Sequence, residues 1–189
     1  FVSIEEKLMK NKRFPPLIIL PPLIFLGLAI LFILGVKREN PNNLPSVFIN
    51  KPAPTITENP LKSFTSVSLD EIKSPNIKLV NFWASWCPPC RAEHPKLLEL
   101  SEQGIQIIGI NFNDNEDNAS LYLKESGNPF TSIAFDPLGK TAIDWGVTAP
   151  PETFIINSEG IVIFRFAGPL VGTDYENRFV PVLKDALQD

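Results

Sequence analysis

The sequence predicts an α/β sandwich, in which helices flank a mixed central sheet, with a transmembrane helix ahead of it. Strand-like and helix-like segments alternate from Phe64 onward, an order typical of a sheet covered by helices. Nearer the beginning, residues 17–36 form a run of 20 residues without a charge, about the length that a membrane-spanning helix needs. We therefore expect four parts: a cytoplasmic N-terminus at 1–16, an anchor at 17–36, a linker and lead-in at 37–60, and a folded domain at 61–189.

The first half of the folded domain contains two short apolar runs. Residues 78–83 and 105–112 are mainly apolar, which predicts buried strands. Each run is followed by a segment that predicts a helix, at about 88–102 and about 118–126. The domain is therefore expected to begin as strand, helix, strand, helix.

The second half predicts a hairpin and a last helix. Residues 152–157 and 161–166 flank Ser158-Glu159-Gly160, a turn sequence between two strand-like runs. Apolar residues between 175 and 186 recur at helical spacing, and Pro181 within that stretch leaves the helix boundaries open. Strand–helix–strand followed by hairpin and helix gives a mixed sheet.

Two other interpretations of residues 17–36 are weaker than an anchor. A cleaved signal peptide has a shorter apolar core and a small-residue cleavage site, and Leu34-Gly35-Val36 matches such a site poorly. A buried core helix would hardly be apolar all round. Pro21 and Pro22 disfavour regular helix, so the helical part is expected to begin after Pro22. The run favours an uncleaved anchor.

Charge is distributed unevenly along the chain. The formal charge of −4 divides into +4 over residues 1–38 and −8 over residues 39–189. Lys10, Lys12 and Arg13 precede the apolar run, and this positive cluster places the N-terminus in the cytoplasm and the folded domain across the membrane. An acidic domain excludes a nucleic-acid partner, which requires a basic face.

The chemistry is concentrated in Trp86-Cys87-Pro88-Pro89-Cys90, where a predicted strand passes into a predicted helix. Two cysteines three positions apart on a first helical turn bring their sulfurs within disulfide reach. The free amides of a helix N-terminus stabilise a thiolate, so the pKa of Cys87 is expected to be low. Cys87 is expected to meet solvent, with Cys90 lying deeper. This setting predicts a redox-active pair.

Three other uses of such a pair are weaker. A structural disulfide across two residues closes a small loop and stabilises little. A zinc site needs more ligands than this chain offers beside the pair, since it has no other cysteine and His94 is its one histidine. Covalent haem attachment requires a histidine directly after the second cysteine, where Arg91 stands. We expect no metal and no cofactor.

Three segments together resemble a known family. They are Val80–Cys90, Gly127-Asn-Pro-Phe130 and Gly146-Val-Thr-Ala-Pro-Pro-Glu-Thr-Phe154. With the apolar run, they resemble the membrane-tethered thioredoxin-like proteins of cytochrome c maturation, the DsbE or CcmG type, over about residues 45–189. The resemblance implies a thioredoxin-like sandwich that reduces the cysteine pair of apocytochrome c before haem ligation. It also implies an inner-membrane location, a domain on the periplasmic side, and a membrane electron donor that reduces the protein again.

The resemblance also implies roles for single residues. Cys87 matches the nucleophilic cysteine, Cys90 the resolving cysteine, and Pro151 the cis-proline that faces them, although Pro150 leaves open which proline is cis. Trp86, Pro151 and Glu152 are expected at the substrate, and Glu152 has the alternative of an ordinary glutamate at a strand start.

Glu93 matches the family's acid in the helix after the motif. Cys87, Cys90, Glu93 and Leu97 lie at spacings of three, three and four, so Glu93 shares their inward-facing side. A partly desolvated carboxyl there has a raised pKa suited to moving protons for Cys90; the alternative is a solvated glutamate. Ordinary thioredoxins carry a buried aspartate where this chain has Asn81, which favours Glu93 for the proton transfer.

Other functions remain to be weighed against a reductase. A Sco-type metallochaperone shares the fold and the anchor, but it needs a wider cysteine spacing and a distant ligand histidine. The same residues also fit three other functions. These are a docking module without activity, a general reductase for other clients, and an oxidant that forms disulfides. Residue identities do not fix a redox potential, so the direction of the reaction stays open. His94 is expected to be solvated or half-packed rather than catalytic.

Overall fold

The computed structural model describes residues 16–36, 47–57, 59–68 and 70–188. The chain forms two compact units, residues 1–41 and residues 42–189, and each is described here by itself. Parts of the expected N-terminus and linker, residues 1–15 and 37–46, lie outside the described residues.

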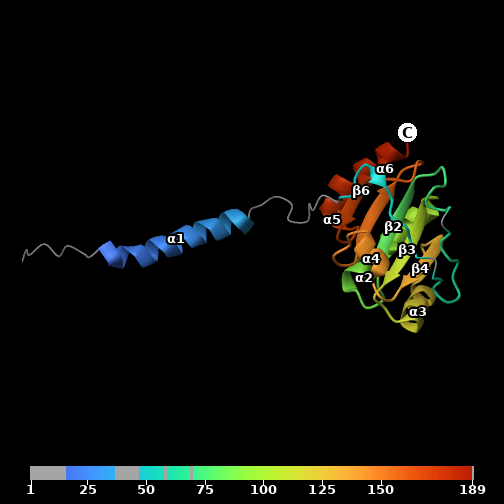
Figure 1. Cartoon of the computed structure of the whole chain (residues 1–189), viewed down its shortest axis with the longest axis horizontal. Helices are drawn as coiled ribbons and strands as arrows, with labels where there is room; N and C mark the ends of the chain where they lie inside the picture. Colours follow the sequence, from blue (N-terminus) through green and yellow to red (C-terminus); the bar gives the residue numbers. More distant parts are fainter. Residues whose placement is uncertain (1–15, 37–46, 58, 69, 189) are drawn as a thin grey trace, which may run out of the picture. The chain divides into compact units, whose positions relative to one another are not determined.

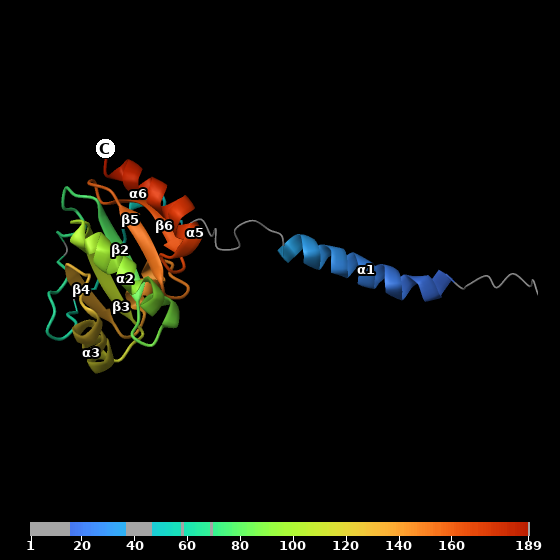
Figure 2. The same cartoon turned by 180° about the vertical axis from the view of Figure 1, so that it is seen from behind.

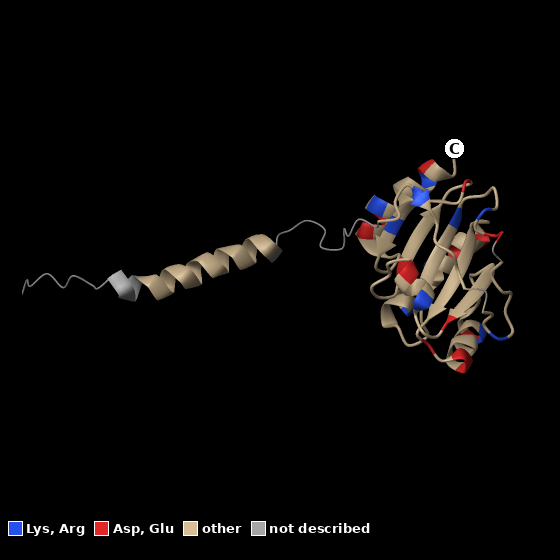
Figure 3. Cartoon of the chain, in the orientation of Figure 1, with Lys and Arg blue, Asp and Glu red and all other residues tan. Residues whose placement is uncertain are grey.

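The first unit contains helix α1, Pro16–Val36. None of its residues is charged, and Figure 3 shows no charged residue in the part of the helix that it colours. The helix begins before Pro21 and Pro22 and continues through them, so the expectation that it starts after Pro22 is wrong. Each interior proline removes one i→i−4 hydrogen bond, and here the helix continues on both sides of the pair. Within the part of the chain that the structure describes, no helix is both long enough and apolar enough to cross a bilayer.

The second unit is built on a mixed sheet whose strand order is β1-β6-β5-β2-β3-β4. Neighbours β2, β3 and β4 are parallel, whereas β5 and β6 run antiparallel to the strands beside them. The strands are β1 (Lys51–Pro52), β2 (Lys78–Trp83), β3 (Gln106–Phe112), β4 (Ser132–Asp136), β5 (Glu152–Ile156) and β6 (Ile161–Ala167). The predicted mixed sheet is confirmed, with β2 and β3 formed by the two apolar runs.

Helices cover both faces of this sheet. Figure 1 shows α4 (Lys140–Asp144) in front of the strands, and Figure 2, from behind, shows α2 (Pro88–Glu102) in front of them. The face of α2 also carries α3 (Glu116–Ser126) and the C-terminal helices. These are α5 (Gly172–Asp174), a π-helical turn (Tyr175–Phe179) and α6 (Val180–Ala186).

Two features of the domain are not predicted from the sequence. Strand β4 and helix α4 are five residues each, too short for a clear period. Pro181 does not break the last helix: it is the second residue of α6 and directly follows the π-helical turn, where the regular i→i−4 hydrogen-bond pattern is already interrupted. The wider π-helical turn comes just before it.

The core consists of one cluster of side chains on each face. Successive residues of a strand point to opposite faces. Leu79 and Ile107 therefore join the cluster under α2, while Val80 and Ile108 join the cluster that includes Trp145. All six residues of β2 are buried, because the strand is central and covered on both sides. This central strand leads directly into the cysteine motif.

Candidate active site

The cysteine motif lies between the end of β2 and the start of α2. Cys87 is the N-cap residue of α2, and a disulfide joins it to Cys90 with a Cα–Cα distance of 5.3 Å. The backbone amide of Cys90 donates to the Cys87 sulfur at 3.2 Å. The sulfur of Cys87 thus lies at the helix end, where free amides stabilise a thiolate.

Both cysteines are nearly buried. Cys87 is 2% and Cys90 is 4% exposed, so the expectation that Cys87 is clearly the more exposed is wrong in this disulfide form. The chain around residue 150 lies against Cys87, whose sulfur is 3.6 Å from the Pro150 carbonyl oxygen. The peptide bond between Pro150 and Pro151 is cis, so Pro151 is the cis-proline, as the family pattern implies.

Glu93 is fully buried on the inward side of α2, one turn after Cys90. Its Oε1 accepts a hydrogen bond from Asn81 Nδ2 at 2.8 Å, and its Oε2 accepts one from the Leu170 amide at 2.8 Å. Burial raises the pKa of Glu93 to about 7, against the smaller opposing effects of the Leu170 and Asn81 hydrogen bonds. A solvated helix glutamate is therefore ruled out, and a proton can exchange on this carboxyl near neutral pH.

Asn81 links three elements below the cysteines. Its Nδ2 donates to Glu93 on α2 and, at 3.0 Å, to the Thr153 hydroxyl on β5. Asn81 and Thr153 are register partners on β2 and β5, and both are fully buried. The Asn81 Oδ1 atom has no hydrogen-bond partner within the described part of the chain.

Glu152 lies next to Thr153, and successive positions on a strand point to opposite faces. Its side chain is 1% exposed. Oε1 accepts from the Thr148 amide at 2.9 Å and from the Thr148 hydroxyl at 3.0 Å, and Oε2 accepts from Arg165 Nε at 2.7 Å. Glu152 therefore fastens the start of the loop that contains Pro150 to strand β6. A bound substrate would therefore touch this loop, and Glu152 would act on the substrate only through the position of the loop.

Trp86 is the exposed member of the motif, with 53% of its surface accessible. Its indole nitrogen donates to the Asn113 carbonyl oxygen at 2.8 Å. The neighbouring Ser85 is held by Asp114, which accepts from both its amide and its hydroxyl. Asp114 also accepts from Asn111 Nδ2 at 2.9 Å.

These contacts of Asp114 and Asn81 are not predicted from the sequence, and neither is the Arg165 partner of Glu152. One signal for Asp114 is present, since Asn113-Asp114-Asn115 is a polar segment directly after a buried strand. The carboxyl ends of neighbouring parallel strands meet at one edge of a sheet, where ligands and reactive groups gather.

His94 lies on α2 about one turn after Cys90, and its ring packs toward α3. It is 5% exposed, its Nε2 is 3.1 Å from the Gly127 carbonyl oxygen, and its ring packs edge-on against Tyr122. Burial lowers the pKa of His94, against the opposing effect of backbone hydrogen bonds. It is more deeply packed than the sequence suggests, and within the described residues its hydrogen bond and ring contact go to Gly127 and Tyr122 and not to the redox pair.

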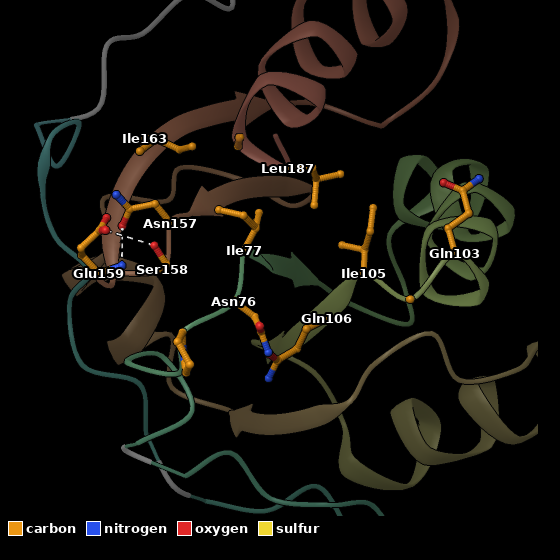
Figure 4. A pocket seen from close by; sticks show the side chains of 13 residues that line it. Asn76, Ile77, Gln103, Ile105, Gln106, Asn157, Ser158, Glu159, Ile163 and Leu187 are labelled. Carbon is orange, nitrogen blue, oxygen red and sulfur yellow. Dashed lines mark hydrogen bonds between the residues drawn. The ribbon is translucent and has the colours of Figure 1, made fainter. Parts of the chain in front are cut away.

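A separate depression of about 860 Å³ lies at the other end of the sheet (Figure 4). Its lining includes Ile77, just before β2, and Gln106, at the start of β3. The cysteines follow the opposite end of β2. The depression is therefore not part of the redox site.

The comparisons with known proteins agree with this geometry. Residues 49–182 match the family model described as Redoxin. A thiol:disulfide interchange protein DsbE homolog of Paracoccus denitrificans is 50% identical over 175 residues, covering 93% of this chain and 97% of that protein. This chain belongs to the DsbE family of thiol:disulfide interchange proteins.

Two further relatives extend the comparison. The thiol:disulfide interchange protein HelX of Rhodobacter capsulatus is 39% identical over 168 residues, covering 89% of this chain and 96% of that protein. The crystal structure of a putative DsbE from Chlorobium tepidum is 27% identical, with a TM-score of 0.62 over 77% of this chain and 99% of that one. This DsbE-family chain has a thioredoxin-like fold and is a thiol–disulfide oxidoreductase with Cys87 and Cys90 as its cysteine pair.

Proposed function

We propose that the protein reduces the disulfide of the cysteine pair in apocytochrome c, so that haem can be attached. The resemblance of its motifs to the cytochrome c maturation proteins supports this client. The observation that carries the chemistry is Glu93, a buried carboxyl behind a disulfide at a helix end, with no ion pair to any residue that the structure describes. A group of this kind supplies and removes protons where water has little access.

The reaction begins with Cys87. Its thiolate attacks one sulfur of the client disulfide, that S–S bond breaks, and the other client sulfur leaves as a thiolate that takes up a proton. The product is a mixed disulfide between Cys87 and the client. Cys87 is the nucleophile because its sulfur accepts the Cys90 amide at the N-terminus of α2.

The second step belongs to Cys90 and Glu93. The Glu93 carboxylate takes the proton of the Cys90 thiol, and the new thiolate attacks the sulfur of Cys87. The mixed disulfide breaks, the Cys87–Cys90 disulfide forms, and the client leaves as a dithiol. Two electrons have passed to the client. A dithiol donor in the membrane returns the protein to its reduced form.

Substrate contacts surround Cys87. Trp86 offers an exposed apolar ring beside it, and the loop at Pro150 and Pro151 lies against its sulfur. Glu152 supports this loop through Thr148, so its effect on the client is indirect.

The proposed location is the inner membrane, with the catalytic domain on the periplasmic side. Residues 17–36 serve as the anchor, residues 1–16 stay in the cytoplasm, residues 37–60 form the linker and lead-in, and residues 61–189 form the catalytic domain. The basic cluster ahead of the apolar run supports this orientation.

The client is tested with the full chain, reduced and held in lipid nanodiscs. The probe is an oxidised peptide that contains a Cys-x-x-Cys-His haem-attachment segment. We expect free peptide thiols with the wild type, none with Cys87→Ser, and a trapped peptide adduct on Cys87 with Cys90→Ser. A peptide with the same composition but separated cysteines serves as the control. Equal reduction by wild type and Cys87→Ser would contradict the assignment of the nucleophile.

The direction is tested by equilibrating the same protein with glutathione buffers. A reductase is expected to have a potential closer to thioredoxin, about −270 mV, than to the oxidant DsbA, about −120 mV. A value near that of DsbA would mean that the protein forms disulfides instead.

A further inference from the structure

Three buried polar side chains beneath the cysteine pair are joined by hydrogen bonds. Asn81 of β2, Glu93 of α2 and Thr153 of β5 are each fully buried. The Asn81 amide is the centre of the group, with its Nδ2 at 2.8 Å from Glu93 Oε1 and at 3.0 Å from Thr153 Oγ1.

The hydrogen bonds observed suit a Glu93 carboxylate. A carboxylate only accepts, and it accepts here from Asn81 and from the Leu170 amide. A protonated Glu93 has one O–H to donate, and the Leu170 amide cannot accept it. The acid form therefore needs an acceptor that is different from its present partners.

Asn81 can supply that acceptor without moving its backbone. Its Oδ1 has no hydrogen-bond partner among the described residues, and an amide offers an acceptor and two donors on one planar group. Rotation of the amide by half a turn places Oδ1 where Nδ2 stands. Oδ1 then accepts from the Glu93 O–H and from the Thr153 hydroxyl, which is itself both donor and acceptor.

We propose that Asn81 is a positioning residue for the exchange reaction, whose amide donates to the Glu93 carboxylate and, after rotation, accepts from the Glu93 acid. This inference rests on the proposed role of Glu93 as proton carrier. An aspartate at position 81 lacks the donor for the carboxylate, and an apolar residue lacks both functions.

No ion pair to Glu93 occurs within the described residues. The groups bonded to Glu93 are the Asn81 amide on β2 and the Leu170 backbone amide. Its charge also acts on Tyr122 of α3, whose pKa is raised mainly by burial, lowered by the Arg91 charge and raised less strongly by Glu93. Arg91 acts on Tyr122, over whose ring it lies.

The experiment measures the Glu93 titration directly. In the oxidised full chain the cysteines do not titrate, so the ¹³C signal of labelled Glu93 and the side-chain ¹⁵N signal of Asn81 are followed from pH 4 to pH 10. We expect both signals to change with one common midpoint. An Asn81 side-chain signal that stays constant through the Glu93 midpoint would overturn the proposal.

Variants separate this role from simple packing. Asn81→Leu removes both the donor for the carboxylate and the acceptor for the acid, and the bond to the charged form is the stronger of the two. The Glu93 midpoint is therefore expected to rise by about one pH unit. The rate of mixed-disulfide resolution at pH 7 should then fall about fivefold, in proportion to the carboxylate fraction. If the leucine variant does not fold, Asn81→Asp tests the same point, since two adjacent carboxyls titrate in two separated steps. A single step at the wild-type midpoint in either variant would contradict the proposal.

Asn111→Leu is the matched control. Asn111 is a buried asparagine on the neighbouring strand β3 that also donates to a carboxylate, Asp114, and not to Glu93. Its loss should leave the Glu93 midpoint in place. If Glu93→Gln itself does not change the pH dependence of resolution, the proposed function of Glu93 fails. If it does and Asn81→Leu leaves the midpoint unchanged, only the role of Asn81 fails.

Discussion

Glu93 and Glu152 are two buried glutamates whose surroundings differ. Each lies close in the chain to part of the redox site, Glu93 after Cys90 and Glu152 after Pro151, and each is at most 1% exposed. Glu152 faces a cation, Arg165, and two donors from Thr148. Glu93 faces two neutral donors and has no ion pair within the described residues.

The difference shows that burial alone does not decide what a carboxyl does. Glu152 is tied into an ion pair and braces the loop beside Cys87. Desolvation dominates at Glu93 and raises its pKa to about 7, and within the described residues no ion pair offsets it. The same type of side chain thus serves as a brace on one face of the sheet and, in the function proposed above, as a proton carrier on the other.

The largest effect is expected from removing the cation of Glu152. Arg165→Met leaves a buried charge without its partner, which typically lowers the free energy of unfolding by about 3–5 kcal/mol. Urea denaturation of the oxidised protein at pH 7 measures this loss. Lys62→Met is the control, because Lys62 and Asp117 are 69% and 84% exposed and such a pair contributes about 0–1 kcal/mol. Equal losses in the two variants would mean that Glu152 and Arg165 do not form a brace.

The second prediction concerns Glu93 and pH. Its pKa is higher in the folded protein than the ordinary value of 4.5, so the protonated form contributes stability below pH 4.5 that is lost as pH rises through about 7. The shift corresponds to about 3 kcal/mol. Glu93→Gln removes the titrating group, so its stability relative to the wild type should increase by up to that amount between pH 4 and pH 8.

Urea denaturation of the oxidised forms at several pH values checks this prediction. Glu99→Gln is the control, since Glu99 lies on the same helix with its side chain 52% exposed. If the difference between Glu93→Gln and the wild type does not depend on pH, Glu93 carries no raised pKa.

A smaller effect is expected at Asp114, which is half-buried and accepts from neutral donors. Asp114→Ala leaves the Ser85 and Asn111 donors unsatisfied, and the loss should be about 1–3 kcal/mol. The same variant should slow adduct formation on Cys87, because Ser85, two residues before Cys87, loses its support. Asp117→Ala, whose side chain is 84% exposed, should change neither quantity. A stability unchanged in Asp114→Ala would show that this cluster does not hold the motif.

The parts of the fold that can be predicted from the sequence are those whose apolar residues form a clear pattern. Strands β2 and β3 and helix α2 are predicted because their apolar residues recur over six or more positions. Strand β4 and helix α4 are not predicted, since five residues contain too little pattern. Their formation depends on contacts with distant segments, such as the bond from the Ile133 amide to the Thr65 carbonyl oxygen.

The residues of the site likewise fall into two groups, those that the sequence predicts and those that it does not. Cys87, Cys90 and the inward side of Glu93 follow from spacing along one helix. The partners of Glu93 and Glu152 do not, because Leu170 and Asn81 lie 77 and 12 positions away from Glu93 and only the folded chain brings them together. Whether a buried acid meets Arg165 or a neutral amide is decided by strand register, which a single sequence does not specify.

The most direct test of the role of Glu93 is the pH dependence of the resolving step. The mixed disulfide between Cys87 and the client peptide is formed in the full chain, and the rate of its resolution by Cys90 is measured by rapid quench from pH 5 to pH 9. The wild type should show an inflection near pH 7, the pKa of Glu93, and Glu93→Gln should lose that inflection and resolve more slowly at pH 7 and above. Profiles of wild type and Glu93→Gln that overlay across this range would contradict the account.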